Sequence, residues 1–320
     1  MLRMISALVS VTFTCLTPTW SLGYPDKPIR LIVPYAAGGN ADITARVVAQ
    51  KMSQGLGQAI IVENKGGANG GIGTDFVAKS APDGYTLLMT ASGPIVVNPV
   101  LYSSVPYDPV KDLKPVSIVL TYQYALVVSA KSSVHSVEDL IRQAKVEAWA
   151  YGSAGIGSGG HLAGAMLAQT TGVPMTHIAY KGNAPALADL LAGVLPFTFD
   201  TVATATPQVR NGGLRPLAVS GPKRAGSFPK VPTMQELGFK GFDVTQFVGL
   251  MAPAKTDPAI IKRLQQEVVK ALNAPDVVER LQTQGGNDLV GSTPEAFAAT
   301  IQRELTMYRK LVRDAKIQPE

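Results

Sequence analysis

The feature that most constrains the fold is a repeated unit, in which a short apolar run ends in a glycine-rich turn and a helical pattern follows. The first copy is IRLIVPYAAGGNADITARVVAQKM, residues 29–52. A second copy begins with the apolar run at 60–63, and a third occupies 149–172. Alternation of strand and helix is typical of parallel sheets whose faces are covered by helices. The sequence therefore predicts an α/β protein.

Ten apolar runs bounded by turn-forming residues are predicted strands, and helical patterns separate many of them. The chain has 320 residues, which is more than one ordinary core holds and suits two lobes. No tandem repeat or low-complexity linker divides it. The predicted strands lie at 29–33, 60–63, 86–89, 117–121, 125–129, 148–151, 175–179, 195–199, 215–219 and 245–251.

Apolar side chains at helical spacing predict three long amphipathic helices. The first should end at Gly57, because glycine readily takes the left-handed conformation of a helix C-cap. The apolar faces consist of Ile43, Val47, Val48, Met52 and Leu56, then Ile260, Ile261, Leu264, Val268 and Leu272, and finally Phe297, Ile301, Leu305 and Leu311.

Residues 1–23 have the pattern of a secretory signal peptide. Arg3 precedes an apolar, threonine-rich stretch, and Ser21-Leu22-Gly23 is a small-x-small ending. We expect cleavage after Gly23 and an exported mature chain. No later stretch offers the roughly twenty consecutive apolar residues of a membrane-spanning helix.

The single cysteine, Cys15, lies inside this leader. A lipid anchor there is the less favoured alternative, because Thr12-Phe13-Thr14 is a poor lipoprotein cleavage sequence. A mature chain without cysteine has no disulfides, so its stability must come from a hydrophobic core. With 46% hydrophobic and 16% charged residues, the chain supplies one.

The formal net charge of +6 is spread along the chain. There is no run of Lys or Arg and no interleaved aromatic platform, so nucleic acid is not an expected partner. A mildly positive field favours small anionic molecules.

The glycine-rich turn at Gly38-Gly39 has the pattern of an anion site. A strand that leads through glycine into a helix leaves backbone N–H groups exposed, with the helix dipole behind them. Glycine also lets a ligand approach the backbone closely. The alternative is that Gly38-Gly39 only makes a tight turn, with Asn40 as the helix N-cap.

The stretch WAYGSAGIGSGGHLAGAMLAQTTG, residues 149–172, repeats this design. Ser153 and Ser158 add hydroxyl groups, and His161 stands near the start of the helix. Two such helix N-termini, one in each lobe, could hold an acid from both sides. Taken alone, His161 is more easily explained as an ordinary, hydrogen-bonded surface or core histidine.

Enzyme motifs receive little support. GIGSGG satisfies G-x-G-x-x-G, but Tyr180-Lys181 stands where a dinucleotide site needs an acidic residue. No G-x-S-x-G elbow exists. The three histidines, His135, His161 and His177, lack ligand spacing, so neither a metal nor a cofactor is predicted.

Successive segments across the mature chain resemble one family. They are YPDKPIRLIVPYAAGGNAD, VENKGGANGGIGTDFVAKSAPDGYTLL, NPVLYSSVPYDPVKDLKPVSIV, YGSAGIGSGGHLAG, YKGNAPALADLLAGVLPFTFD and VPTMQELGFKGFDV. In this order they are similar to the solute receptors of tripartite tricarboxylate transporters, also called the Bordetella uptake gene (Bug) family.

The resemblance implies a periplasmic binding protein of type II-like fold, in which each of two lobes is a mixed, mainly parallel sheet flanked by helices. Such a receptor closes on a small carboxylated solute and delivers it to membrane permease subunits, or in some members serves as a sensor. We expect a monomer without a cofactor. The lobes would be 24–124 plus 248–320 and 125–247. The rival from another class is a periplasmic enzyme that uses Ser153 or Ser158 with His161.

The resemblance also assigns site residues. A first pincer (residues 35–42) and a second pincer (residues 153–161) would hold the carboxylate through backbone N–H groups. Asp42 is equally well explained as a first-turn residue that stabilises the helix dipole. Ala41 and Ala165 depart from the family pattern, so the solute of a relative cannot be transferred. The expected ligand-binding residues are Tyr35, Gly38, Gly39, Asn40, Asp42, Ser153, Gly157, Ser158, His161 and Asp200.

Overall fold

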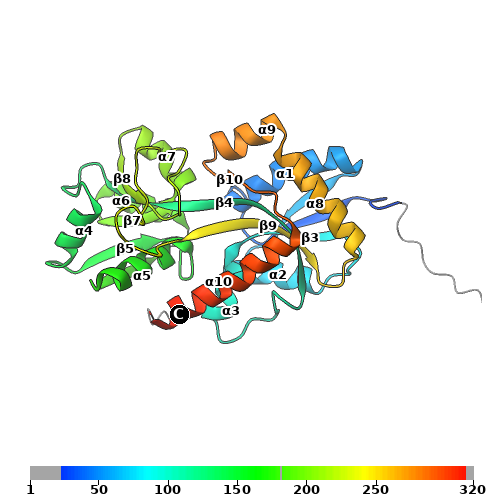
Figure 1. Cartoon of the computed structure of the whole chain (residues 1–320), viewed down its shortest axis with the longest axis horizontal. Helices are drawn as coiled ribbons and strands as arrows, with labels where there is room; N and C mark the ends of the chain where they lie inside the picture. Colours follow the sequence, from blue (N-terminus) through cyan, green and yellow to red (C-terminus); the bar gives the residue numbers. More distant parts are fainter. Residues whose placement is uncertain (1–22, 181, 315–320) are drawn as a thin grey trace, which may run out of the picture.

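The computed structural model describes residues 23–180 and 182–314 and shows two α/β lobes bridged by long strands (Figure 1). Apart from Gly23, the predicted signal peptide lies outside the described residues. Among these residues, no helix has both the length and the apolar character that membrane crossing requires. The predicted α/β class with two lobes is confirmed.

The first lobe is built on a mixed sheet in the order β2-β1-β3-β9-β4. Strands β1, β2 and β3 are parallel, whereas β9 runs antiparallel to both β3 and β4. In β1, four of the five residues are buried, as expected for a strand covered on both faces. The bounds are β1 Ile29–Val33, β2 Ile60–Asn64, β3 Thr86–Ala91, β9 Thr245–Pro253 and the short β10 Asp288–Leu289, which pairs with β4.

Strand β4 (Leu113–Ser129) continues from the first lobe into the second. It pairs with β9 as far as Gln123, with β7 from Tyr124 onward and with β8 from Ala125 onward. The prediction of two separate strands, 117–121 and 125–129, is wrong. The intervening Tyr122 and Gln123 resemble a break, but both are buried. The Tyr122 hydroxyl donates to Gln246 in β9, and Gln123 Oε1 accepts from the N–H of Gly221, in the return segment 220–244 that leads from β8 to β9.

The second lobe places β7, β5 and β6 side by side and parallel, and both β7 and β8 pair antiparallel with β4. The predicted strand at 195–199 is displaced by two residues in the structure. The bounds are β5 Trp149–Ser153, β6 Met175–Ala179, β7 Phe197–Thr201 and β8 Leu214–Val219.

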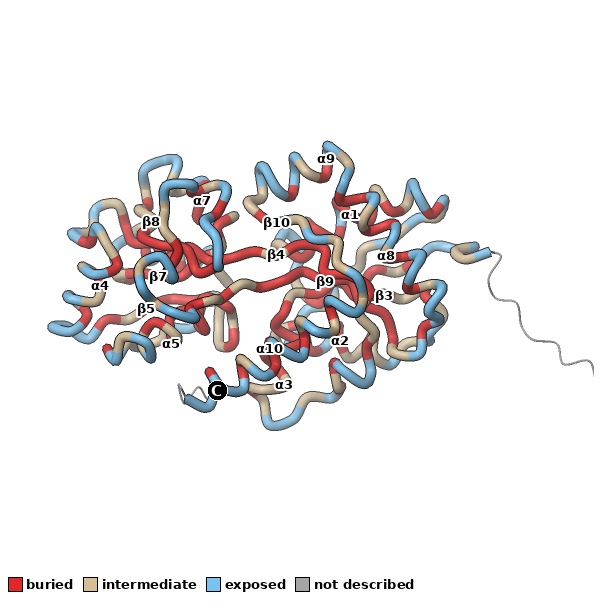
Figure 2. Tube along the Cα trace, viewed as in Figure 1, coloured by how far each residue is buried: buried red, intermediate tan, exposed pale blue. Residues whose placement is uncertain are grey.

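Helices cover both sheets, and the buried residues concentrate along the strands (Figure 2). The apolar faces of α1, α8 and α10 are buried as predicted, except that Ile43 at the start of α1 is 41% exposed and Ile260 at the start of α8 is only partly buried. Gly57 caps α1 with φ of 71°, as expected. The helices are α1 Asn40–Leu56, η1 Ala68–Gly70, α2 Gly71–Ala78, η2 Gly93–Val97, α3 Asn98–Leu101, α4 Val137–Ala144, α5 Gly159–Thr171, α6 Asn183–Ala192, α7 Val202–Arg210, α8 Pro258–Leu272, α9 Pro275–Val277, η3 Val278–Thr283 and α10 Pro294–Asp314.

Candidate functional site

Both pincers lie at the carboxyl ends of parallel strands. The first follows β1, between β2 and β3, and the second follows β5, between β6 and β7. Each leads directly into a helix, α1 of 17 residues or α5 of 13 residues. The carboxyl edge of a parallel sheet is the usual place for ligands in α/β proteins. The topology therefore gives each lobe one helix N-terminus at such an edge.

The first pincer is held in shape by Asp42. Gly38 has a φ of 88°, a conformation that favours glycine, and its N–H donates to Asp42 Oδ2 at 2.9 Å. Arg46 and Asn64 also donate to this carboxylate. Burial alone would raise the pKa of Asp42, but the hydrogen bonds from Arg46, Gly38 and Asn64 outweigh it and hold the pKa below its usual value. The structure thus engages Asp42 within the turn itself.

The alternative that Asn40 is the N-cap of α1 is wrong. Gly39 occupies the N-cap position, and the Asn40 amide donates to Asn287 Oδ1 at 3.2 Å. Gly39 has extended backbone, and a Cβ added to it would have Ala36 O, at 3.9 Å, as its nearest neighbour. A side chain at position 39 would therefore point into open space in front of the helix.

The second pincer is organised by Ser158 and His161. Ser158 is the N-cap of α5, and its Oγ accepts a hydrogen bond from the His161 N–H at 3.3 Å. The Gly157 N–H donates to His161 Nδ1 at 3.0 Å. In this geometry the neutral imidazole carries its proton on Nε2. His161 is therefore a buried histidine whose Nδ1 is used as an acceptor within the turn.

A second histidine, which the sequence analysis did not assign to the site, completes this pincer. The His177 ring stacks on His161 with centroids 3.8 Å apart, and its Nε2 lies 2.7 Å from Ser153 Oγ. Burial lowers the pKa of His161 to about 3, with His177 contributing, and burial lowers the pKa of His177 to about 4. Both rings are neutral near neutral pH. The adjacent parallel strands β5 and β6, which pair Ser153 with Ala179, were the available signal.

The two lobes touch at Gly157. Its φ is 75°, and a Cβ there would lie 2.9 Å from Leu101 Cδ2 and 3.2 Å from Val97 Cγ1. Asn69, a further residue missed from the sequence, is 3.7 Å from the same point. The glycine is required both by its backbone conformation and by the close approach of η2 and α3 from the first lobe.

Tyr35 lies on the first-lobe side of this contact. A Cβ added to Gly93 would lie 3.4 Å from Asn69 Nδ2 and 3.6 Å from the Tyr35 hydroxyl. Burial raises the pKa of the Tyr35 hydroxyl. Asn69 and Tyr35 thus both lie next to Gly93, and Asn69 also lies close to Gly157 of the second pincer.

Asp200 is the penultimate residue of β7 and lies opposite Ala125 of β4, the strand that continues from one lobe into the other. The Asn183 amide donates to its Oδ1 at 2.6 Å. Its Oδ2 is buried and finds no hydrogen-bond partner among the described residues. Burial raises the pKa of Asp200 to about 6, so the carboxyl is mostly ionised near neutral pH. A buried acceptor of this kind is costly unless another molecule supplies a donor.

Tyr124 joins the crossing strand to the second pincer. A Cβ added to Gly159, the first residue of α5, would lie 2.4 Å from atoms of the Tyr124 ring. The Tyr124 hydroxyl donates to Gln246 Oε1 at 2.8 Å. The start of α5 is thus packed directly against the bridge between the lobes.

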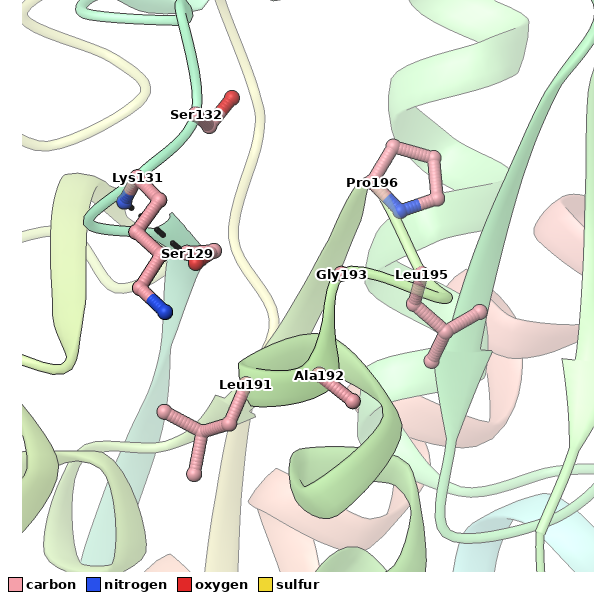
Figure 3. Close-up of a pocket in the computed structure, with 8 residues that line it drawn as sticks. All are labelled: Ser129, Lys131, Ser132, Leu191, Ala192, Gly193, Leu195 and Pro196. Carbon is pink, nitrogen blue, oxygen red and sulfur yellow. Dashed lines mark hydrogen bonds between the residues drawn. The ribbon is translucent and has the colours of Figure 1, made fainter.

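A separate cavity of about 250 Å³ lies at the other edge of the second lobe (Figure 3). It is formed between the end of β4, around Ser129 and Lys131, and the turn from Gly193 to Pro196. Pro196 precedes β7, whereas the second pincer follows the carboxyl end of β5, which is parallel to β7. The cavity is therefore distinct from the pincers.

Comparison with known proteins places the chain in a family. The model of the tripartite tricarboxylate transporter family receptor matches residues 44–317. The protein BugT of Bordetella pertussis is 39% identical over 294 residues, which cover 91% of this chain and 90% of BugT.

Solved structures agree over nearly the whole chain. The periplasmic binding protein BugD is 34% identical with a TM-score of 0.82, covering 93% of this chain and 100% of its own. Rpa4515 of R. palustris, solved with adipate, is 31% identical with a TM-score of 0.85, covering 93% of this chain and 100% of its own. MatC of Rhodopseudomonas palustris, solved with malate, is 29% identical with a TM-score of 0.80, covering 90% of this chain and 100% of its own. The chain therefore belongs to the receptor family of tripartite tricarboxylate transporters, in which it is similar to the Bug proteins.

Proposed function

We propose that this chain is a periplasmic receptor that traps a small organic carboxylate between its lobes and delivers it to the permease subunits of a tripartite tricarboxylate transporter. The observation that carries the proposal is the pair of helix N-termini, α1 and α5, each at the carboxyl edge of its sheet behind a glycine-rich turn. Relatives solved with adipate and malate support the same chemical class.

The attraction for an anion comes from the backbone. The first N–H groups of a helix have no partner within it, and the macrodipole places partial positive charge there. At the second pincer both histidines are neutral near neutral pH, so they add no net charge. At the first pincer, Arg46 offsets the charge of Asp42. The N–H groups of α1 and α5 are thus the expected carboxylate donors.

Asp200 is the proposed contact for the rest of the ligand. Its free Oδ2 can accept a hydrogen bond but, when ionised, repels a second carboxylate. A ligand hydroxyl or amino group would satisfy this oxygen. Malate, which MatC holds, has such a hydroxyl, whereas adipate has none. The expected solute is therefore a hydroxy or amino acid.

The proposed lobes are 24–124 plus 248–320 and 125–247. The change of pairing partner along β4, from β9 at Gln123 to β7 at Tyr124, supports the first boundary. Bridges of this type allow the lobes to close on a ligand. A sensor that presents the loaded receptor to a signalling protein would use the same site and differ only in its partner.

An enzyme is less well supported, although Ser153 Oγ and His177 Nε2 lie 2.7 Å apart. Ser153 is only 2% exposed, and its hydroxyl also donates to Gly155 O. His177, with its pKa lowered to about 4 by burial, is a weak base. The family and its solved structures are binding proteins rather than enzymes.

Calorimetric titration tests the proposal. Wild type and Asp200→Asn would each be titrated with malate, adipate and malamide, the uncharged diamide of malate. We expect malate to bind more tightly than adipate, malamide to fail, and Asp200→Asn to reduce the preference for malate. Binding of malamide as tight as that of malate would contradict the carboxylate pincers, and an unchanged preference in Asp200→Asn would remove Asp200 from the proposed site.

A further inference from the structure

Strands β4 and β9 form the bridge that joins the lobes. A cavity of about 200 Å³ lies between this bridge and α10. Its walls come from three parts of the chain: the bridging strands, the return segment that precedes β9, and one face of α10. The lining residues are Ile118, Thr121, Pro222, Asp243, Thr245, Gln246, Phe247, Thr300, Arg303, Glu304 and Met307.

Glu304 is the unusual member of this lining. Glu304 is only 9% exposed, and its Oε2 has no hydrogen-bond partner among the described residues. Tyr308, one turn further along α10, is fully buried, and its hydroxyl is equally without a partner there. Within residues 23–180 and 182–314, Glu304 takes part in none of the ion pairs.

The titratable and charged groups around Glu304 come from three elements. Arg303 and Tyr308 belong to α10, Tyr122 faces it from β4, and Asp243 from the return segment. Asp243 accepts a hydrogen bond from Thr245 and forms no ion pair in the described part of the chain. Asp243 opposes ionisation of Glu304, whereas the exposed Arg303 favours it.

This cavity is connected to the bridge and to the second pincer by contacts. The hydroxyls of Tyr122 and Tyr124 both donate to Gln246 Oε1 at 2.8 Å. Gln246 lines the cavity, and Tyr124 packs on Gly159 at the start of α5. Helix α10 also contacts α5 itself, so it spans from the first lobe to the second (Figure 1). A movement of α5 relative to α10 therefore changes the surroundings of Glu304.

We propose that Glu304 is a proton-binding site of the bridge, protonated when the lobes are closed and ionised when they open and water enters the cavity. The inference rests on the proposed function, because ligand binding supplies the closure. Trapping of the carboxylate then takes up a proton at Glu304. Ligand affinity should fall as the pH rises, because closure then takes up a proton from a solution that holds fewer of them.

The direction of titration agrees with the geometry. Burial raises the pKa of Glu304 to about 8, with Arg303 opposing and Asp243 reinforcing the shift. A hydrated Glu has a pKa of about 4.3. Between these values the open state has lost the proton and the closed state retains it. Linkage then predicts uptake of up to about one proton per ligand near neutral pH, and a fall in affinity of up to about tenfold per pH unit within that window.

The experiment is calorimetric titration of wild type with malate and with adipate at about pH 7, in phosphate and in Tris, whose ionisation enthalpies differ. The slope of the observed enthalpy against the buffer enthalpy counts the protons taken up. About pH 7 is chosen because Asp200, with its pKa near 6, then contributes little. Glu304→Gln removes the proton site with little change of shape. Glu295→Gln makes the same change on the exposed first turn of α10 and is the control.

We expect uptake in wild type and Glu295→Gln, and its loss in Glu304→Gln, together with a flatter dependence of affinity on pH. Equal uptake in Glu304→Gln and wild type, or no uptake in wild type, would overturn the inference while leaving the receptor function intact. If neither acid binds to folded wild type, the proposed function fails, and this coupling with it. Urea unfolding of Glu304→Gln checks the fold, since the variant should be no less stable than wild type at about pH 8.

Discussion

The backbone N–H of Gly157 donates to Nδ1 of His161 at 3.0 Å, and this bond fixes the chemistry of the second pincer. With Nδ1 acting as an acceptor, the imidazole must be neutral and must carry its proton on Nε2. Protonation of His161 would remove the acceptor and release the turn. The stacked His177, whose centroid lies 3.8 Å away, further opposes a positive charge.

Acid should therefore destabilise the protein through His161. The pKa of His161 is lowered to about 3 in the folded chain, so the unfolded chain binds more protons between that value and about 6.5. The free energy of unfolding should fall as the pH falls through this window. At about pH 4.5 the loss from His161 is about 2.5 kcal/mol.

Urea unfolding of His161→Asn at about pH 4.5 and 7 measures this contribution. Asparagine keeps an acceptor near the position of Nδ1 but does not titrate. The variant should lose about 2.5 kcal/mol less than wild type on acidification, and the partly buried His177 accounts for part of the loss that remains. His135→Asn, in the loop before α4, should behave like wild type. Equal acid sensitivity of His161→Asn and wild type would show that His161 does not limit stability in acid.

Adjacent glycines of the first pincer should respond differently to substitution. Gly38 has a φ of 88°, which a residue with a Cβ rarely adopts, so Gly38→Ala should lower the free energy of unfolding by about 1 kcal/mol or more. Gly39 has extended backbone and open space beside it, so Gly39→Ala should be within about 0.5 kcal/mol of wild type. Urea unfolding of both variants is the measurement. The opposite order would contradict the turn geometry.

Closure should be sensitive to the size of residue 157. Gly157→Ala places a methyl group 2.9 Å from Leu101 Cδ2 in a backbone conformation that disfavours it, so it should weaken malate binding by tenfold or more. Leu101→Ala removes the atom that collides. The double variant should recover part, but not all, of the affinity lost in Gly157→Ala, because the backbone strain remains. If the losses of binding free energy in the two single variants simply add in the double variant, this contact between the lobes would be contradicted.

Asp200 should cost stability in the ligand-free protein. Its pKa is raised to about 6, so the folded chain holds a proton that the unfolded chain has lost between about 3.9 and that value. The contribution of Asp200 to the free energy of unfolding is largest below this pH window and falls as the pH rises through it. Asp200→Asn should therefore be more stable than wild type at about pH 7, by up to about 3 kcal/mol. A variant less stable than wild type would show that the carboxylate is satisfied in the folded protein.

Much of the fold could be predicted from the sequence, because alternating apolar runs and helical faces are local signals. The continuity of β4 through Tyr122 and Gln123 could not, since these two residues look like a loop until Gln246 and Gly221, which are distant in the sequence, supply their hydrogen-bond partners. The same limit applies to the site. The turn glycines are visible as a pattern, whereas His177 joins the second pincer only through the pairing of β5 with β6.

Glu304 shows that limit most clearly. On the sequence it is a polar residue within an amphipathic helix, and such residues usually face water. Its burial arises because α10 lies over the bridge, where the return segment and β4 close around it. Contacts between distant segments, and not the local pattern, decide which polar residues are buried here.

The most direct test of the receptor function is thermal unfolding of the chain from Tyr24 onward, without the predicted signal peptide. The panel consists of hydroxy, amino and unsubstituted di- and tricarboxylates. At about 100 times its dissociation constant, a ligand adds roughly 2.7 kcal/mol, which shifts the midpoint by several degrees. Gly39→Val, whose side chain would stand in front of α1, is the matched variant. We predict that at least one acid raises the midpoint of wild type but not that of the folded variant. An acid that stabilises both proteins equally would contradict carboxylate binding at the first pincer, and a ligand-free wild type that responds to no acid would contradict the receptor function.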